Sequence, residues 1–440
     1  MRKVNQAWAF GDHLERLAVT CEVKVLRHRA DELPHSTVIA ILEGAVLGRE
    51  GRRERQVAVG SGFALDVEQA ATAALAEGLE RWHLLAPPED TRSCRAPELP
   101  EGRVLRADEW PTFTPEQLRL PRFPWRGYHP EQHHTWTRVL RIPSGEPLWV
   151  PASLVSNSTA VERFMPSVSS GAAYHVSTAR AVLSGLLEVV ERDAFTIVWE
   201  SRSTTPLLNP HAPWQAPEVR LIARELERRG LRFLLRDLTT DLGIPTVLAV
   251  VHDPRERRPA LALGAATRLS LRAACEKAAR EVCHTWAWMC DEHDSRRMTR
   301  DETLTRLEVH HDMSLHPYLY GFPQSLPGAS HLLTEAGFAS GGPPADAPGR
   351  EGAPEEGLRR LVERLEARGH QVFYKDLSAP VTREPGAGVV KVFVTGLVPL
   401  SVGLWGRALG HPRIRDVPPR MNWPHPGPLA PEHGVPHPFP

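Results

Sequence analysis

The stretch that decides the fold is residues 67–85, VEQAATAALAEGLERWHLL, which follows two apolar, β-branched runs at 35–44 and 56–65. Within it, large apolar side chains recur at the three- and four-residue spacing of an amphipathic helix. The positions are Val67, Ala71, Leu75, Leu79 and Trp82. The segment therefore predicts strand, turn and helix, with Gly60-Ser61-Gly62 read as the turn that precedes the helix.

A second copy of this pattern follows along the chain. PLWVPASLV (147–155) predicts a strand, the Ser-rich residues 167–171 a turn, and about 178–199 a helix. Residues 86–130 are rich in Pro, Arg and Trp without a sustained period, so we expect an irregular surface connection there. We assign no chemistry to that connection.

The C-terminal half contains a weak internal repeat. ELERRGLRFLLRDLT (225–239) matches RLEARGHQVFYKDLS (364–378), and each copy predicts an amphipathic helix, a Gly stop and a strand. Units of this kind place helices on one face of a mixed sheet, so the fold class is α/β with mixed α+β character. Between the copies we expect a long helix at about 268–290 and a flexible segment at 340–357, SGGPPADAPGREGAPEEG.

Composition excludes several classes of function. The 440 residues are enough for two or three structural units, and Lys+Arg (53) equals Asp+Glu (53). A chain without net charge gives no general attraction for nucleic acids, so we expect no nucleic-acid partner. No apolar run is long enough for a signal peptide or a membrane span, and the five Cys form no C-x-x-C pair. These features predict a cytoplasmic protein with reduced thiols and no membrane partner.

One carboxylate pattern occurs twice: Glu77-x-x-Glu80-Arg81 in the first predicted helix and Glu188-x-x-Glu191-Arg192 in the second. Residues three apart are neighbours on a helix, so each pair presents two carboxylates side by side. If the two helices faced each other, four clustered carboxylates would call for hard cations such as Mg²⁺, which shares its ligands with phosphate oxygens. The pattern therefore predicts a magnesium-nucleotide site.

A plainer interpretation stays open, because Glu77–Arg81 and Glu188–Arg192 are also spaced as i,i+4 surface pairs. Repetition of the motif after a Gly-containing turn favours the functional interpretation. The sequence contains no G-x-x-x-x-G-K-[ST] and no G-x-G-x-x-G after a strand, so neither a P-loop nor a dinucleotide-binding motif is indicated.

The end of the sequence, Pro436-His437-Pro438-Phe439-Pro440, alternates Pro with other residues. Alternating Pro imposes extended polyproline II geometry and reduces the entropy lost when such a tail is fixed. The tail could therefore deliver its terminal carboxylate to a definite place, and a solvated terminus is the alternative.

Together, the two E-x-x-E-R helices, the segment Asp237–Pro245, the stretch VVKVFVTGLVPL (389–400) and the PHPFP ending resemble the YcaO family, and most closely its azoline-forming cyclodehydratases. The resemblance implies a YcaO-like fold of ferredoxin-like units with helices packed on mixed sheets. It also implies an ATP- and Mg²⁺-dependent reaction. A Cys, Ser or Thr of a ribosomal precursor peptide attacks the preceding carbonyl, ATP phosphorylates the amide oxygen, and loss of phosphate leaves a thiazoline or oxazoline.

The same resemblance implies roles for individual residues. Glu77, Glu80, Glu188 and Glu191 would bind the metal, and Pro440 would assist proton transfer through the chain's last carboxylate. The implied nucleotide-binding positions are Glu77, Glu80, Arg81, Ser170, Arg180, Ser184, Glu188, Glu191, Arg192 and Glu281. The chain departs from the family pattern at Ser61, Ala73, Ser170 and Arg180, and Arg180 puts a cation where the family has a Glu.

Domain organisation and partners follow from this resemblance. We expect an N-terminal segment at 1–54, a YcaO-like ATP-binding domain at 55–420 and a Pro-rich tail at 421–440. Only about 50 residues precede the first motif, so we expect a separate E1-like (ThiF-like) partner to bind the leader of the peptide. A flavin-dependent azoline dehydrogenase and a homodimer are compatible with the resemblance and stay open.

Two alternatives to azoline formation remain. A YcaO-type enzyme that forms thioamides or amidines is the first, and the PHPFP ending disfavours it. The second is a degenerate YcaO scaffold that binds a peptide or a partner without ATP, which is motivated by Ser61, Ala73 and Arg180.

Overall fold

The structure is a computed structural model. It describes residues 11–26, 35–48, 51–100, 102–110, 112–121, 123–166, 169–309, 312–338, 353–378, 388–430 and 434–439. The chain divides into two compact units. Unit 1 comprises Met1–Trp110, Tyr128–Val189 and Ala353–Gly396, and unit 2 comprises Pro111–Gly127, Val190–Gly352 and Leu397–Pro440.

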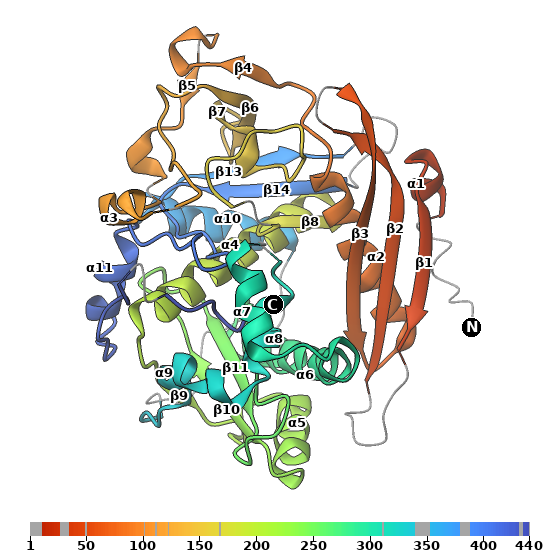
Figure 1. Cartoon of the computed structure of the whole chain (residues 1–440), viewed down its shortest axis with the longest axis vertical. Helices are drawn as coiled ribbons and strands as arrows, with labels where there is room; N and C mark the ends of the chain where they lie inside the picture. Colours follow the sequence, from red (N-terminus) through yellow and green to blue (C-terminus); the bar gives the residue numbers. More distant parts are fainter. Residues whose placement is uncertain are drawn as a thin grey trace. The chain divides into compact units, whose positions relative to one another are not determined.

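The first sheet of unit 1 is antiparallel, with the strand order β1-β2-β3. Its strands are β1 (Thr20–Val25), β2 (Ser36–Leu47) and β3 (Arg53–Ala64), and α1 (Gly11–Arg16) precedes them. Helix α2 (Val67–Leu84) covers one face of this sheet (Figure 1). The Asp66 carboxylate caps its first turn by accepting the backbone N–H groups of Glu68 and Gln69. The predicted strands and helix of this region are confirmed.

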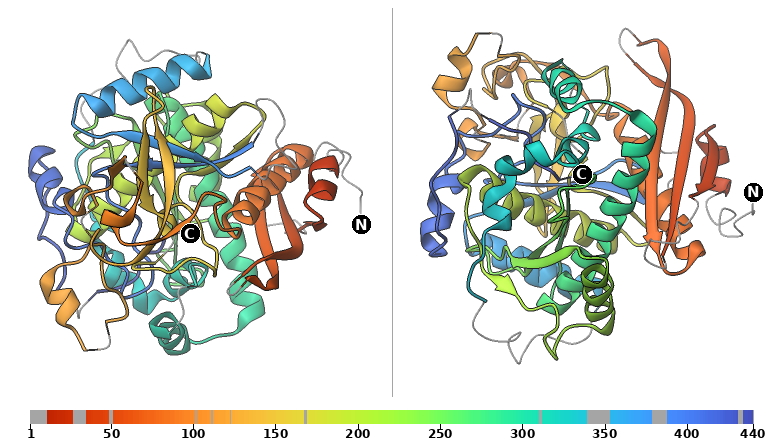
Figure 2. Two further views of the ribbon diagram at one scale, coloured as in Figure 1. Left: turned by 90° about the horizontal axis from the view of Figure 1, so that it is seen from above. Right: turned by 60° about the horizontal axis from the view of Figure 1, so that its bottom comes forward.

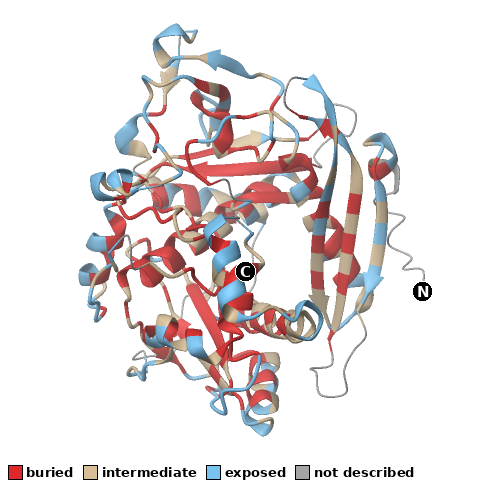
Figure 3. Cartoon of the chain, in the orientation of Figure 1, coloured by how far each residue is buried: buried red, intermediate tan, exposed pale blue. Residues whose placement is uncertain are grey.

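Burial alternates along β2 and β3, as Figure 3 shows. In β2 the side chains of Val38, Ala40 and Leu42 are fully buried, and they share a core cluster with Leu75 and Leu79 of α2. Period-two burial in the strands and period-3.6 burial in the helix fix which face of each element meets the other.

The second sheet of unit 1 has seven strands in the order β5-β7-β6-β13-β14-β8, and β4 also pairs with β6. The strands are β4 (Arg92–Cys94), β5 (Arg103–Val104), β6 (His134–Arg141), β7 (Pro147–Pro151), β8 (Ala172–His175), β13 (Val372–Asp376) and β14 (Gly388–Val394). β5 and β7 are parallel and the other pairs are antiparallel, so the sheet is mixed. Helix α10 (Pro354–Glu366) packs on β13 (Figure 2, left).

Unit 2 contains one four-stranded antiparallel sheet in the order β12-β11-β10-β9 among its described residues. Its strands are β9 (Leu207–Leu208), β10 (Arg232–Asp237), β11 (Thr246–His252) and β12 (Leu261–Thr267). Helix α6 (Leu271–Arg296) packs on β11 and β12. The other helices are α3 (Pro115–Arg119), α5 (Pro217–Arg228), α7 (Arg300–Val309), α8 (Leu315–Tyr320), α9 (Ser330–Leu333) and α11 (Arg413–Arg420).

Helix α4 (Thr178–Ser201) carries the second E-x-x-E-R motif. Its residues to Val189 belong to unit 1, and those from Val190 belong to unit 2. Glu188 is therefore described with unit 1, whereas Glu191 and Arg192 are described with unit 2.

The predicted internal repeat is confirmed as structure. Its two copies form α5–β10–β11 in unit 2 and α10–β13–β14 in unit 1. Gly230 and Gly369 follow the two helices with φ of +73° and +83°, the left-handed conformation in which Gly ends a helix without a steric penalty. A mixed α/β fold with helices on mixed sheets is confirmed.

Two expectations, for residues 340–357 and for residues 86–130, need correction. Residues 354–357, expected to be flexible, form the first turn of α10, because Pro354 occupies the helix start where its missing N–H costs nothing. Residues 340–352 lie outside the described residues. The connection at 86–130 is not wholly irregular, because β4 and β5 join the seven-stranded sheet. None of the helices in the described part of the chain has the length and apolar character that crossing a bilayer requires.

Candidate functional site

Gly60 and Gly62 lie inside strand β3, so the predicted turn at Gly60-Ser61-Gly62 is wrong. A Cβ on Gly60 would overlap the carbonyl oxygen of Ala74, and one on Gly62 would overlap that of Ala70. These glycines therefore allow α2 to approach the strand to backbone contact. The close approach brings Ser61 beside the first E-x-x-E-R motif.

Glu77 of α2 is bound to β3 at this point. Its Oε2 accepts the backbone N–H of Ser61 at 2.6 Å and the Ser61 hydroxyl at 3.1 Å, and its Oε1 accepts Nη2 of Arg81 at 2.6 Å. Arg81 also donates from Nη1 to the carbonyl oxygen of Val59 at 2.6 Å. The predicted i,i+4 pair thus forms, and both members also contact the strand.

Glu80, one turn along α2, faces the second sheet of unit 1. Its Oε1 accepts the backbone N–H of Tyr174 in β8 at 2.8 Å. Burial raises the pKa of Glu80 well above its ordinary value; the Tyr174 N–H opposes the shift, and the charges of Glu77 and Glu188 add to it. Glu188, which is distant in sequence, therefore gathers with Glu77 and Glu80 in unit 1.

Glu188 is held by the turn that enters β8. The backbone N–H of Gly171 donates to Glu188 Oε2 at 3.1 Å, and Nζ of Lys391 in β14 donates to the carbonyl oxygen of Ser170 at 2.6 Å. Burial lowers the pKa of Lys391 to about 8, and the charge of Glu188 opposes that shift. Ser170 thus contacts this region through its backbone carbonyl oxygen, which accepts the Lys391 ammonium.

Arg180 and Ser184, on the first turns of α4, are exposed. Arg180 lowers the pKa of His175, as a smaller cause than burial. Among the described residues, no hydrogen bond or ion pair joins Arg180 or Ser184 to Glu77, Glu80 or Glu188. The structure therefore brings the three carboxylates together and leaves these two residues in solvent.

In unit 2, Glu191 is buried, and its Oε2 accepts the backbone N–H of Thr267 at the end of β12, at 3.1 Å. Arg192 Nε lies 3.9 Å from Glu191 Oε1. Glu281 forms an ion pair with Lys277 one turn earlier on α6. Burial alone would raise the pKa of Glu281, but Lys277 and His284 hold it at about 2. Glu191 and Glu281 thus each accept a hydrogen bond within unit 2.

The tail is seated in unit 2. Residues 436–439 are buried, so a solvated terminus is wrong for them. The Tyr320 hydroxyl donates to the carbonyl oxygen of Pro436 at 2.8 Å, and His437 Nε2 lies 2.7 Å from the carbonyl oxygen of Ser401. His316 Nδ1 lies 3.2 Å from the carbonyl oxygen of His437. Pro440, the predicted catalytic residue, lies outside the described residues.

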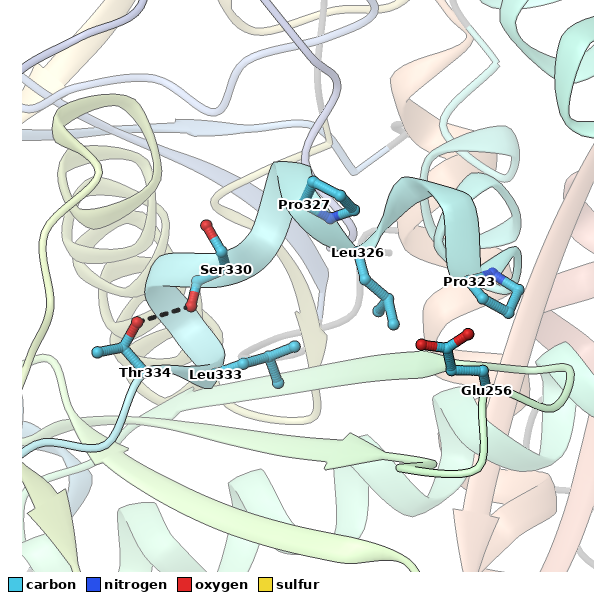
Figure 4. Close-up of a pocket in the computed structure, with 7 residues that line it drawn as sticks. All are labelled: Glu256, Pro323, Leu326, Pro327, Ser330, Leu333 and Thr334. Atoms are coloured by element: carbon cyan, nitrogen blue, oxygen red, sulfur yellow. Dashed lines mark hydrogen bonds between the residues drawn. The ribbon is translucent and has the colours of Figure 1, made fainter.

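A pocket of about 430 Å³ lies elsewhere in unit 2 and is drawn in Figure 4. Glu256 is its one ionisable lining residue; the others are Pro323, Leu326, Pro327, Ser330, Leu333 and Thr334. None of the predicted site residues lines it. With one carboxylate and no cationic side chain, this mainly apolar lining lacks the set of charged groups that a metal-bound triphosphate requires.

The described residues contain no group of three His, Cys, Asp or Glu side chains already arranged around one metal position. The carboxylates of unit 1 instead accept backbone N–H groups. Burial is the main cause of the raised pKa of Glu80, and the charges of Glu77 and Glu188 add to it. A cation would compensate these charges, and carboxylate oxygens suit Mg²⁺, so the chemistry of the donor set fits the ion.

Sequence reasoning missed Lys391 as a member of this region. The stretch VVKVFVTGLVPL supports the family resemblance as a whole, and that resemblance implies no separate role for its Lys. A signal was available, since a Lys in the middle of an otherwise apolar strand is rarely buried without a specific partner.

Comparisons with known proteins agree with this architecture. A family model described as YcaO cyclodehydratase, ATP- and Mg²⁺-binding, matches residues 61–398. An uncharacterized protein of Methanothermobacter thermautotrophicus is 27% identical over 403 residues, which cover 90% of this chain and 93% of that protein.

Two solved structures share the fold. One is a heterocyclase in complex with substrate and cofactor, with a TM-score of 0.73 and 20% identity over 96% of this chain. This chain spans 55% of that heterocyclase. The other is YcaO from Methanopyrus kandleri bound with AMPPCP and Mg²⁺, with a TM-score of 0.62 and 23% identity over 90% of each chain.

Proposed function

This chain belongs to the YcaO family, and from that premise we propose that it is an ATP-dependent cyclodehydratase that forms thiazoline or oxazoline rings in a ribosomal precursor peptide. The observation that carries the proposal is the gathering of Glu77, Glu80 and Glu188 in unit 1, where burial, and to a smaller extent the charges of the other two, raise the pKa of Glu80. Such a cluster is costly unless a cation compensates it.

The proposed Mg²⁺ ligands are Glu77, Glu80 and Glu188, with Glu191 as a fourth. The proposed nucleotide contacts are Arg81, Ser170, Arg180, Ser184, Arg192 and Glu281. When bound with Mg²⁺, ATP supplies the phosphoryl group that turns an amide oxygen into a leaving group. The sulfur or oxygen of the substrate side chain forms the new bond to the preceding carbonyl carbon, and the phosphorylated amide oxygen leaves as phosphate. ATP is thereby converted to ADP and phosphate, and the peptide loses the elements of one water.

The tail and the partners complete the proposal. The contacts of Tyr320, His316 and Ser401 hold Pro436 and His437. We propose that Pro440 assists proton transfer during ring formation. An E1-like partner would bind the leader of the peptide and present its Cys, Ser or Thr residues.

Calorimetry of the chain with ATP and Mg²⁺ tests the site directly. We expect saturable binding that requires the metal and that is lost in Glu188→Gln, since the neutral amide is a poor Mg²⁺ ligand. Glu146→Gln is the matched control, because the Glu146 side chain is 70% exposed and lies outside the carboxylate cluster. Absence of binding by the unaltered chain would favour a scaffold that does not use ATP.

Mass spectrometry tests the reaction. A precursor peptide incubated with the chain, the E1-like partner and Mg-ATP should lose about 18 Da per ring, the mass of the water removed when the amide oxygen departs. A gain of mass that depends on sulfide would instead support thioamide formation. An unchanged peptide, with nucleotide binding intact, would contradict cyclodehydration.

A further inference from the structure

Lys391 lies in the middle of β14 and is 3% exposed. It is one of five lysines in a sequence with 53 basic residues, so nearly every other cation is Arg. A buried ammonium needs compensation for the hydration that it has lost. The Lys391 ammonium receives part of it from the carbonyl oxygen of Ser170, at 2.6 Å.

The Ser170 carbonyl belongs to the same peptide group as the Gly171 N–H, which donates to Glu188 Oε2 at 3.1 Å. A trans peptide group points its C=O and N–H in opposite directions and carries a dipole of about 3.5 D along that line. The cation of Lys391 therefore sits at the negative end of this dipole, and the anion of Glu188 sits at its positive end. Each interaction strengthens the other.

The turn that carries this peptide group is fixed by its surroundings. Gly171 has a φ of +86°, which a residue with a side chain adopts only with strain. Its carbonyl oxygen accepts the backbone N–H of Val392 at 2.8 Å, and Gly185 of α4 packs against it without a side chain. The peptide plane is thus held between β14 and α4, with Lys391 and Glu188 at its two ends.

We infer that Lys391 is a positioning residue that fixes the carboxylate of Glu188 through the Ser170–Gly171 peptide group. Without the ammonium, the peptide group loses the partner on its carbonyl side, and the N–H that orients Glu188 is held less firmly. The consequence for Mg²⁺ binding rests on the proposed function; the coupling of Lys391 to Glu188 does not.

The neighbouring strand offers a matched control. Lys375 of β13 lies directly opposite Lys391 in the sheet register, and it forms an ion pair with Asp90. Lys375→Met therefore removes an ammonium from the same sheet without touching the Ser170–Gly171 peptide group.

A double-mutant cycle on unfolding tests the coupling without nucleotide. The urea midpoint is measured for Lys391→Met, Glu188→Gln and the double variant. We expect the two shifts to be non-additive, whereas Lys375→Met and Glu188→Gln add. Additive shifts for Lys391 and Glu188 would overturn the inference. Should Lys391→Met fail to fold, Lys391→Gln, which keeps an N–H donor but not the charge, takes its place.

Calorimetry with Mg²⁺ and the non-hydrolysable analogue AMPPCP tests the consequence. Loss of a group that orients a metal ligand lowers affinity about 10–100-fold, so we expect Lys391→Met to bind at least about tenfold more weakly than Lys375→Met. Equal affinity in the two variants would overturn the effect on the metal. Absence of binding in the unaltered chain would overturn the proposed function and leave the result of the cycle standing.

Discussion

The guanidinium of Arg192 lies over the phenyl ring of Phe439, with its Cζ 4.2 Å from the ring centroid. Phe195 packs on the same ring, with the two centroids 4.5 Å apart. A cation held over an aromatic face contributes about 0.5–2 kcal/mol, and the buried ring adds its own hydrophobic contribution. A residue of the second E-x-x-E-R motif is thus in direct contact with the tail.

Replacing Phe439 tests this contact. Phe439→Ala should lower the free energy of unfolding by about 3 kcal/mol, because it leaves a cavity beside Phe195 and removes the ring under Arg192. Urea denaturation measures the change. Phe338→Ala is the control: Phe338 is 65% exposed, and we expect a loss of less than about 0.5 kcal/mol. Equal losses of stability in Phe439→Ala and Phe338→Ala would mean that the contacts of the Phe439 ring add nothing to stability.

While no cation is bound, the folded protein should be less stable with Glu80 charged than with Glu80 neutral. Its folded pKa lies above 4.5, so the stability that it contributes is present below pH 4.5 and is lost as the pH rises through the folded pKa. Glu80→Gln should therefore raise the thermal midpoint at pH 7.5 and change it little at pH 4.5. The variant should also lose the stabilisation that Mg-ATP gives. A lower midpoint at pH 7.5 would contradict this account.

His331 predicts a sensitivity to acid. It is buried beside Trp199, and neither ring nitrogen has a hydrogen-bond partner among the described residues. Burial lowers its pKa from 6.5 to about 3, so the unfolded chain binds a proton that the folded chain does not. Stability is then lost as the pH falls from 6.5 toward 3.

His331→Phe should flatten that dependence, because it removes the group that takes up the proton on unfolding. Urea midpoints measured between pH 7.5 and 5 would report the change in slope. His133→Gln, at an exposed position, should leave the slope as it is. A slope unaltered by His331→Phe would assign the acid sensitivity to other buried groups such as His437.

Gly60→Ala should disrupt the packing of α2 on β3. The added methyl group would overlap the Ala74 carbonyl oxygen, a backbone atom that cannot move aside without shifting the helix. We expect a loss of at least about 3 kcal/mol or insoluble protein, from overpacking of a backbone contact. Gly337→Ala is the control, since no atom lies within 4 Å of the added methyl group. A well-folded Gly60→Ala protein would contradict the close approach.

Periodicity predicted the elements but not how closely they approach one another. The apolar spacing from Val67 to Trp82 located α2, and the copies around Gly230 and Gly369 located two helix-strand units. Gly60 was misread as a turn residue because a glycine that admits a helix and a glycine that admits a bend look the same in one sequence. Only the contact with Ala74 separates the two.

The carboxylates of the site were predictable, and their partners were not. The repeated E-x-x-E-R pattern pointed to Glu77, Glu80 and Glu188 because side chains three apart share a helix face. Their hydrogen bonds run to the backbone of Ser61, Tyr174 and Gly171, which depends on strand placement that no local pattern encodes. Lys391 was missed for the same reason, since its partner is a carbonyl oxygen 221 residues away in the sequence.

The bonds of Glu77 and Arg81 to β3 also bear on self-association. β3 is the last strand of its sheet, and outer strands with unused backbone groups are templates for pairing with other chains. Here the Ser61 N–H is taken by Glu77 and the Val59 carbonyl oxygen by Arg81. A strand of another chain cannot pair along this stretch without first displacing both side chains. The motif that supplies the carboxylates therefore also protects this edge strand from aggregation.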